Sequence, residues 1–146
     1  MERDRSVGRL LGVLHRCARM RFAEAAIAYE IADTQLPILM GLYHQEGLSQ
    51  DDLAREHVLD KATVARSVAR LERAGYVVRS PDEHDRRIKR VELTEKARRI
   101  QSELRQVHQE WSEALTEGFT REERRTLTAL LERMVANAQR HLDRSR

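Results

Sequence analysis

Residues 48–97 read LSQDDLAREHVLDKATVARSVARLERAGYVVRSPDEHDRRIKRVELTEKA, and the caps, turns and apolar residues in this segment predict how the middle of the chain folds. Ser49, with Asp52 three residues later, forms a capping-box variant and predicts a short helix over about residues 49–56. A brief turn leads to Asp60, which suits the N-cap of a longer helix that reaches residue 74 and ends before Gly75. A short helix, a tight turn and a longer helix predict a helix-turn-helix.

The segment after Gly75 predicts a β-hairpin. Residues 76–79 are typical of a strand, residues 81–85 are polar and rich in turn formers, and residues 88–93 predict the returning strand. In that second strand Val91 and Leu93 share one face. A hairpin placed directly after a helix-turn-helix is a wing.

Amphipathic helices flank this lobe. Apolar residues recur at helical spacing over about residues 5–30, and again after Thr94 and after Thr120, both of which suit N-caps. A further helix follows residues 33–34, with Pro37 in its first turn. We therefore predict a mainly α fold of about six helices, with a winged helix-turn-helix lobe, a small β-hairpin wing and a helical lobe.

Charge is unevenly distributed along the chain. The formal net charge is +3, but residues 61–99 hold twelve Lys or Arg and six Asp or Glu, so the remainder of the chain is acidic. A basic segment within an acidic chain indicates a surface for a polyanion. A solvated helix face with ion pairs would give the same composition, so charge alone leaves both interpretations open.

The second helix of the helix-turn-helix has a basic side. Val64, Val68 and Leu71 lie at i, i+4 and i+7 and predict its buried face. The opposite face is expected to present Lys61, Thr63, Arg66, Ser67 and Arg70. Side chains of this kind can contact bases and phosphates in a major groove, whereas the alternative is an ordinary surface helix.

The hairpin tip carries two adjacent arginines, Arg86 and Arg87, after Asp85. An arginine at a loop apex can reach into a narrow minor groove, where the negative potential is enhanced. Asp85 can pin one arginine and brace the loop, which leaves the other free to insert. The sequence leaves open which arginine has which role.

In combination, these motifs resemble the MarR family of transcription regulators. The matching features are the Leu-Ala of the short helix, the T-V…L-E…G-Y-V-x-R pattern of the longer helix and first strand, and D-R-R-x-x-x-V-x-L-T of the wing. The similarity is dense over residues 48–97, with one departure at Ala97, where many relatives have glycine.

The resemblance implies a homodimer in which the first helix and the last two interdigitate with those of the partner. The wide apolar stripes on residues 5–30 and 100–142 fit this independently, because one small lobe could not bury them. We therefore assign residues 1–33 and 115–146 to dimerisation, residues 34–94 to the winged helix-turn-helix and residues 95–114 to a linking helix.

The resemblance also implies a function: a homodimeric repressor bound to double-stranded DNA. Lys61, Thr63, Arg66, Ser67 and Arg70 would face the DNA, Arg86 or Arg87 would enter the minor groove, and Asp85 would brace the wing. A two-fold dimer requires a pseudo-palindromic operator with half-site centres about 34 Å apart.

Many members of this family release DNA when a small aromatic or lipophilic effector binds between the two lobes. Residues that could line such a space here are His15, Arg19, Met40, Tyr43 and Trp111. The alternative is that Met40, Tyr43 and Trp111 belong to the core and that His15 and Arg19 are solvated.

Cys17 offers a different effector mechanism. Some family members sense peroxides through a cysteine on the first helix with tyrosines nearby, and this chain has Cys17 on that helix together with Tyr29 and Tyr43. A reactive thiol needs an electropositive, partly exposed setting, which the neighbouring arginines would permit. Inert packing is the alternative.

The chain has no pattern for catalysis or metal binding. It lacks a glycine-rich phosphate loop, HExxH and a nucleophile elbow, and its six histidines show no i,i+4 pairing. We therefore expect a protein that is not an enzyme and uses no cofactor or metal. The absence of an 18-residue apolar run and of an apolar signal-peptide core predicts a cytoplasmic protein that spans no membrane.

A protein–protein interaction module that uses the winged helix only as a scaffold is the competing class. It predicts an apolar or acidic face on the longer helix of the helix-turn-helix, whereas the predicted face is basic.

Overall fold

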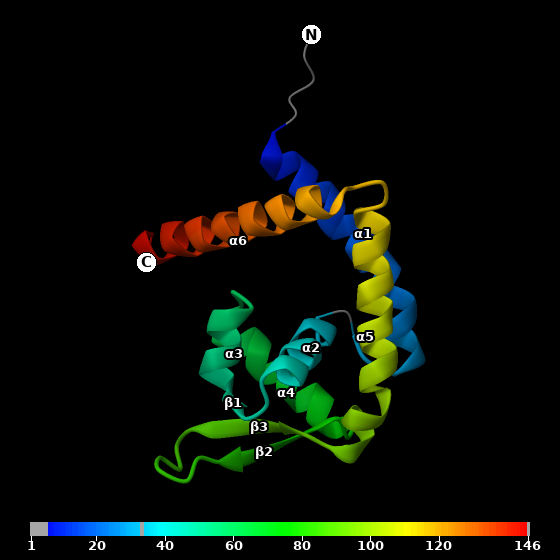
Figure 1. Cartoon of the computed structure of the whole chain (residues 1–146). Helices are drawn as coiled ribbons and strands as arrows, with labels where there is room; N and C mark the ends of the chain where they lie inside the picture. The colour runs from blue at the N-terminus through cyan, green and yellow to red at the C-terminus, as the bar shows by residue number, and fades with distance from the viewer. Residues whose placement is uncertain (1–5, 33, 146) are drawn as a thin grey trace. The chain divides into compact units, whose positions relative to one another are not determined.

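The computed structural model describes residues 6–32 and 34–145, and over these residues it contains six helices and three short strands (Figure 1). In chain order they are α1 (Val7–Ala28), α2 (Leu36–His44), β1 (Leu48–Ser49), α3 (Gln50–Glu56), α4 (Lys61–Arg73), β2 (Val77–Pro81), β3 (Lys89–Leu93), α5 (Glu95–Leu115) and α6 (Arg121–Arg144). Contacts divide them into two units, one that runs to Trp111 and one that starts at Ser112. The predicted fold class is confirmed.

The helix boundaries follow the predicted capping residues. Ser49 and Asp52 form a reciprocal capping box at α3, and Thr120 and Glu123 form another at α6. Asp60 caps α4, where its side chain accepts a hydrogen bond from the Thr63 amide. These caps satisfy amide groups that the first turn of a helix leaves without partners, so they fix where each helix begins.

The sheet has three antiparallel strands in the order β1-β3-β2. The predicted hairpin is β2 and β3, paired from Val77↔Leu93 to Pro81↔Lys89. The strand β1 was not predicted, because two residues are too few to show an alternating pattern. It pairs Leu48 with Val91 and joins the start of α3 directly to the wing.

The core of the first unit lies where α2, α3, α4, the sheet and α5 meet. Its fully buried side chains include Ile38, Leu39, Leu42, Leu53, Val64, Val68, Leu71, Val77, Val91 and Leu104. The hydroxyl of the buried Tyr43 donates a hydrogen bond to the carbonyl oxygen of Ala97 at 2.6 Å, which ties α2 to α5. This core packs against the buried side of α4 and leaves the other side of the helix exposed.

Within the first unit, helix α1 and the part of α5 that ends at Trp111 pack side by side (Figure 1). The rings of Phe22 and His108 stack with centroids 4.3 Å apart, and Trp111 meets Phe22 edge-on. Arg21 forms an ion pair with Glu110 at 3.3 Å. Aromatic pairs of this geometry contribute stabilisation beyond that of the apolar area they bury, so they stabilise the contact between the two helices.

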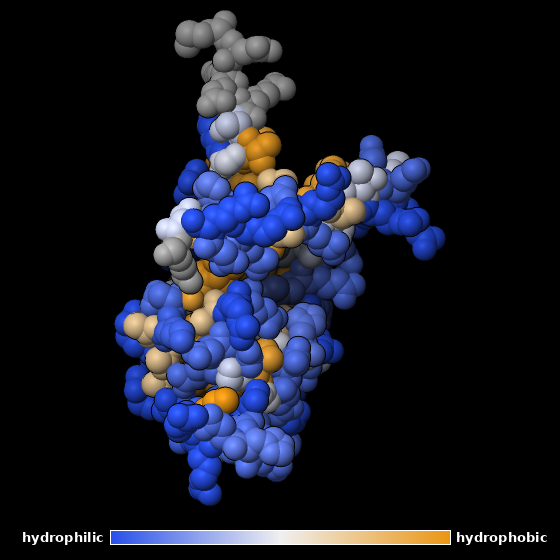
Figure 2. Space-filling model, turned by 90° about the vertical axis from the view of Figure 1, so that its left-hand side faces the viewer, coloured by the Kyte–Doolittle hydropathy of each residue, from blue (hydrophilic) through white to orange (hydrophobic). Residues whose placement is uncertain are grey.

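Each unit leaves an apolar helix face exposed. On α1 the exposed apolar residues at its beginning are Val7, Leu10, Leu11, Val13 and Leu14. Figure 2 shows apolar surface over that part of the helix, next to the grey N-terminal residues. On α6 the exposed set is Leu130, Leu131, Val135 and Leu142, and none of the residues of this helix is buried.

These faces are not membrane spans. Among the described residues, none of the helices combines the length and the apolar character that crossing a bilayer requires.

Candidate nucleic-acid interface

The exposed side of α4 is basic. Lys61, Arg66, Arg70 and Arg73 are all exposed, while Val64, Val68 and Leu71 are completely buried on the other side. Arg73 was not among the predicted interface residues, although its basic type and its position three residues after Arg70 were visible in the sequence. The helix therefore presents a row of cations supported from behind by the core.

A polar chain orders the N-terminal turn of this row. The Asp60 carboxylate accepts hydrogen bonds from the Thr63 amide at 2.8 Å and from the Thr63 hydroxyl at 2.6 Å. These bonds hold the pKa of Asp60 below its usual value. Arg66 in turn donates to the Thr63 hydroxyl oxygen at 3.3 Å, so its guanidinium is oriented along the helix.

Ser67 does not belong to this exposed face, and its predicted placement there was wrong. Its exposed fraction is 4%, which puts it among the buried residues of α4. The reason is helical geometry: Ser67 is three residues after Val64 and four before Leu71, so it shares their face. Ser67 is therefore not part of the exposed row of α4, and we leave it out of the proposed DNA contacts.

The acidic residue of α4, Glu72, is neutralised within the fold. Its carboxylate accepts hydrogen bonds from the Arg79 side chain at 2.6 and 3.1 Å and from the Arg79 amide at 3.2 Å. The Arg79 guanidinium is the main reason that the pKa of Glu72 lies below its usual value. Because Arg79 compensates the charge of Glu72, this carboxylate does not cancel the field of the cations on the exposed side of α4.

At the wing tip the structure shows which arginine Asp85 holds. The Asp85 carboxylate accepts hydrogen bonds from Nε and Nη2 of Arg87, both at 3.0 Å, and from the Arg87 amide at 3.1 Å. This pairing lowers the pKa of Asp85 and raises that of Arg87. The Arg87 side chain is nevertheless 91% exposed, so it is fixed in direction without being buried.

Arg86 differs from its neighbour. It is exposed, and the described part of the chain provides it with neither a hydrogen bond nor an ion pair. The tip thus presents one arginine that Asp85 orients and one, Arg86, that has no such brace among the described residues.

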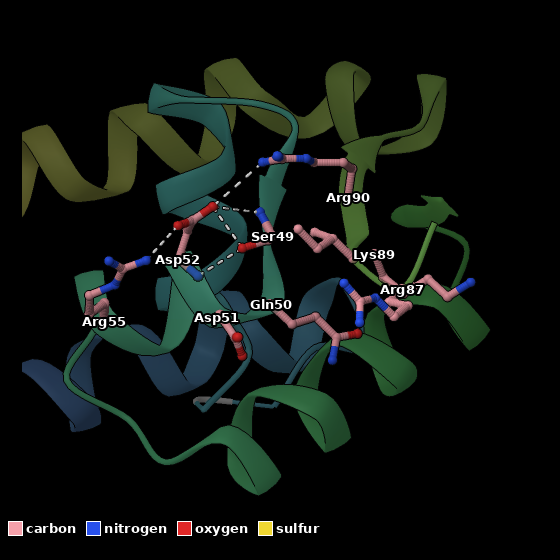
Figure 3. A pocket seen from close by; sticks show the side chains of 9 residues that line it. Ser49, Gln50, Asp51, Asp52, Arg55, Arg87, Lys89 and Arg90 are labelled. Carbon is pink, nitrogen blue, oxygen red and sulfur yellow. Dashed lines mark hydrogen bonds and ion pairs between the residues drawn. The ribbon is translucent and has the colours of Figure 1, made fainter. Parts of the chain in front are cut away.

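The wing and the helix-turn-helix meet across a groove of about 390 Å³ (Figure 3). Arg87, Ile88, Lys89 and Arg90 line it from the wing, and residues 49–52 with Arg55 line it from the start of α3. Lys61 of α4 lies 3.4 Å from Asp51 on the edge of the same groove. The predicted contacts of α4 and of the wing are therefore joined through the first turn of α3.

The predicted effector residues do not all have the same environment. His15 and Arg19 are exposed on α1, Met40 and Trp111 are half-buried, and Tyr43 is buried. Burial raises the pKa of Tyr43 to about 12, and its hydroxyl is already bonded to Ala97. Tyr43 is therefore a core residue in this structure.

Cys17 is exposed on α1. Neither of the two tyrosines considered with it turns its hydroxyl to the thiol: Tyr29 donates to Glu103, and Tyr43 donates to Ala97. Among residues 6–32 and 34–145, there is no group of three or more His, Cys, Asp or Glu side chains arranged to hold a metal ion.

A helix-turn-helix with a basic longer helix, followed by a hairpin with an oriented arginine at its tip, defines the winged helix-turn-helix class of DNA-binding proteins. The chain belongs to the MarR family, whose sequence model matches residues 31–89. It is accordingly a helix-turn-helix transcription regulator that binds DNA.

Known proteins of this family resemble the chain over nearly its whole length. The uncharacterized HTH-type transcriptional regulator YybA of Bacillus subtilis (strain 168) is 30% identical over 93% of this chain and 88% of the relative. The crystal structure of a MarR transcriptional regulator from Methanosarcina mazei Go1 is 35% identical, with 92% of this chain and 96% of that chain covered and a TM-score of 0.86. A crystal structure of MarR is 28% identical, with 99% and 98% covered and a TM-score of 0.83.

Proposed function

We propose that this protein is a homodimeric repressor that recognises a pseudo-palindromic operator in double-stranded DNA. The observation that carries the proposal is the pairing of two features on one unit, the exposed cations of α4 and the oriented Arg87 of the wing. A helix that contacts base edges in the major groove and an arginine that enters the adjacent minor groove can together recognise one half-site.

In this proposal α4 is the recognition helix. Lys61, Thr63, Arg66 and Arg70 contact base edges and phosphates, and Arg73 adds a phosphate contact at the end of the helix. Arginine suits guanine and phosphate because its fork of donors is bidentate, and Thr63 suits either a base edge or a phosphate.

Of the two wing arginines, we assign the minor-groove contact to Arg87, the one that Asp85 holds, which reverses the sequence-based expectation that the unpinned arginine inserts. An arginine that enters a groove gives up side-chain freedom, and the two hydrogen bonds that the Arg87 guanidinium donates to Asp85 already restrict this side chain in the free protein. Its exposed Nη1 edge remains available. Arg86, which has no such brace, is assigned to the phosphate backbone beside the groove.

A second copy of the chain would cover the apolar faces of α1 and α6. Residues 1–33 and 115–146 form the dimerisation region of this proposal, and residues 95–114 link it to the DNA-binding lobe. Exposed apolar rows of this extent on two helices are typical of an interface, since monomers rarely leave such patches in water.

Release from DNA is assigned to a small aromatic or lipophilic effector, with Met40, Trp111, His15 and Arg19 as the residues to vary. Peroxide sensing through Cys17 is the alternative. If peroxide releases DNA from the parent but not from Cys17→Ser, the thiol mechanism replaces the ligand mechanism.

The wing assignment is tested by fluorescence anisotropy on a duplex selected by the protein. Arg87→Ala should weaken binding by about 1–3 kcal/mol, and Arg86→Ala should cost less and reduce the salt dependence by about one counterion. A greater loss for Arg86→Ala would exchange the two roles. If neither variant changes binding, the interaction-module interpretation gains support over DNA recognition.

A further inference from the structure

Arg90 lies where the wing joins the helix-turn-helix. It is in the central strand β3, where its neighbours in register are Ser49 of β1 and Ser80 of β2. Its side chain is 36% exposed, and Figure 3 shows it extending across to Asp52 at the start of α3. Its position between the two other strands lets one guanidinium reach both the wing loop and the first helix of the motif.

On the wing side Arg90 holds the turn that carries the tip. Its Nε donates to Oδ2 of Asp82 at 2.8 Å. The other oxygen of Asp82 accepts the amide hydrogens of His84 at 2.8 Å and Asp85 at 3.0 Å. The Asp85 amide, followed by the Arg90 guanidinium, lowers the pKa of Asp82 to about 2, so this carboxylate is ionised near neutral pH.

On the other side Arg90 meets the first turn of α3. Its Nη1 lies 3.6 Å from Oδ2 of Asp52 and donates to the Gly47 carbonyl oxygen at 3.4 Å. The same Asp52 oxygen accepts hydrogen bonds from the amide and the hydroxyl of Ser49 at 3.1 and 2.7 Å. The Asp52 carboxylate is thus fixed by the capping box and serves as a rigid anchor.

Two backbone hydrogen bonds close the loop at the wing tip, from the Asp82 amide to the Ile88 carbonyl oxygen and from the Ile88 amide to the Asp85 carbonyl oxygen, but neither of them ties the tip to α3. Residues 83–87 are all polar and none of them is buried, so no apolar packing sets the tip against α3. A continuous chain of contacts runs from Arg87 to Asp85, from the Asp85 amide to Asp82, from Asp82 to Arg90, and from there to Asp52.

We propose that Arg90 is a positioning residue for DNA binding, which joins Asp82 of the wing to Asp52 of α3 and so sets Arg87 at a fixed distance from the recognition helix. It acts through the wing and makes no contact with DNA of its own. The inference rests on the proposed function. The competing role for an arginine at this place is a direct phosphate contact.

Two substitutions of Arg90 separate these roles. Arg90→Lys keeps the positive charge, but a single ammonium cannot bridge two carboxylates as the planar fork does. Positioning therefore predicts that Arg90→Lys and Arg90→Gln both lose about tenfold in affinity, whereas a phosphate contact predicts that Arg90→Lys binds like the parent. Asp82→Asn removes the carboxylate that pairs with Arg90, while its amide oxygen can still accept the hydrogen bonds from the His84 and Asp85 amides.

A double-mutant cycle with Arg87 gives the sharper test. If Arg90 acts through the wing, Arg90→Gln should cost less than about twofold once Arg87 is alanine, because there is no longer an arginine to position. The matched control is Lys89→Gln, which removes one charge from the neighbouring position in β3 and should cost the same factor with either residue at 87.

A measurement without DNA completes the design. Amide hydrogen exchange in the peptide that spans residues 82–88 should accelerate in Arg90→Gln and in Asp82→Asn, with exchange in α4 unchanged. Unchanged exchange in the wing, equal losses in both Arg87 backgrounds, or normal binding by Arg90→Lys would each overturn the inference. If the parent protein and Arg87→Ala bind every duplex equally weakly, the proposed function fails, and the exchange result still decides whether Arg90 positions the wing.

Discussion

Gly41 of α2 lies against His57, and we predict that the effect of Gly41→Ala on the free energy of unfolding changes sign when His57 is replaced. Gly41 is buried, and His57 is the C-cap residue of α3. A Cβ built on Gly41 would lie 3.0 Å from Cε1 of the imidazole and closer still to Nε2. The three atoms nearest to that Cβ all belong to this ring, so Gly41 is the position that lets α3 end against α2.

Two opposing effects give the magnitude for Gly41→Ala. Alanine in a helix interior is favoured over glycine by about 1 kcal/mol. Overpacking at a buried contact costs about 1–3 kcal/mol, because the ring or the backbone must shift. We expect Gly41→Ala to lower the free energy of unfolding by about 1 kcal/mol in the parent. In a His57→Ala background the clash is absent, and the same substitution should raise it by about 1 kcal/mol.

The assay is urea unfolding followed by circular dichroism for the four proteins of this cycle, at one protein concentration because association would contribute to stability. The midpoints should move while the slopes stay equal. If Gly41→Ala stabilises both backgrounds by the same amount, the packing argument is refuted.

Three further predictions concern the core, the pH response and the dimer. Tyr43→Phe should lower the free energy of unfolding by about 1 kcal/mol in urea unfolding, since it removes the buried hydrogen bond to Ala97, and an unchanged midpoint would contradict this. Burial lowers the pKa of His57 from 6.5, so the native state favours the neutral ring and the free energy of unfolding should fall as the pH drops below 6.5. His57→Ala should lack this loss when both proteins are unfolded thermally over the same pH series. Identical pH profiles for the two proteins would show that His57 is not responsible. Leu131→Glu on the exposed face of α6 should shift the protein toward monomers in analytical ultracentrifugation and weaken operator binding. The control Glu132→Gln, which changes a charge at the neighbouring position, should do neither. A dimer that persists in Leu131→Glu would exclude this face from the interface.

Local signals were sufficient to predict the helices and the wing. The capping boxes at Ser49 and Thr120 and the cap at Asp60 are each read from residues within one turn, and each stands where the spacing indicated. Asp85 was predicted to pin one arginine for the same reason, because its partner is only two residues away.

The features that sequence reasoning missed depend on distant or very short segments. The strand β1 is two residues long and exists only because β3 pairs with it. Arg90 meets Gly47 and Asp52, which lie far from it in sequence, so no periodicity places them together. Ser67 is a different case: its helical position already placed it beside Val64 and Leu71, and its polar character was wrongly given more weight.

Selection of duplexes from a random pool would show whether α4 and the wing recognise a two-fold operator. We predict enrichment of an inverted repeat with half-site centres about 10 base pairs apart, bound with an affinity that falls steeply with salt and is weakened strongly by Arg87→Ala. A pool without an enriched sequence, together with an Arg87→Ala variant that behaves like the parent, would contradict it.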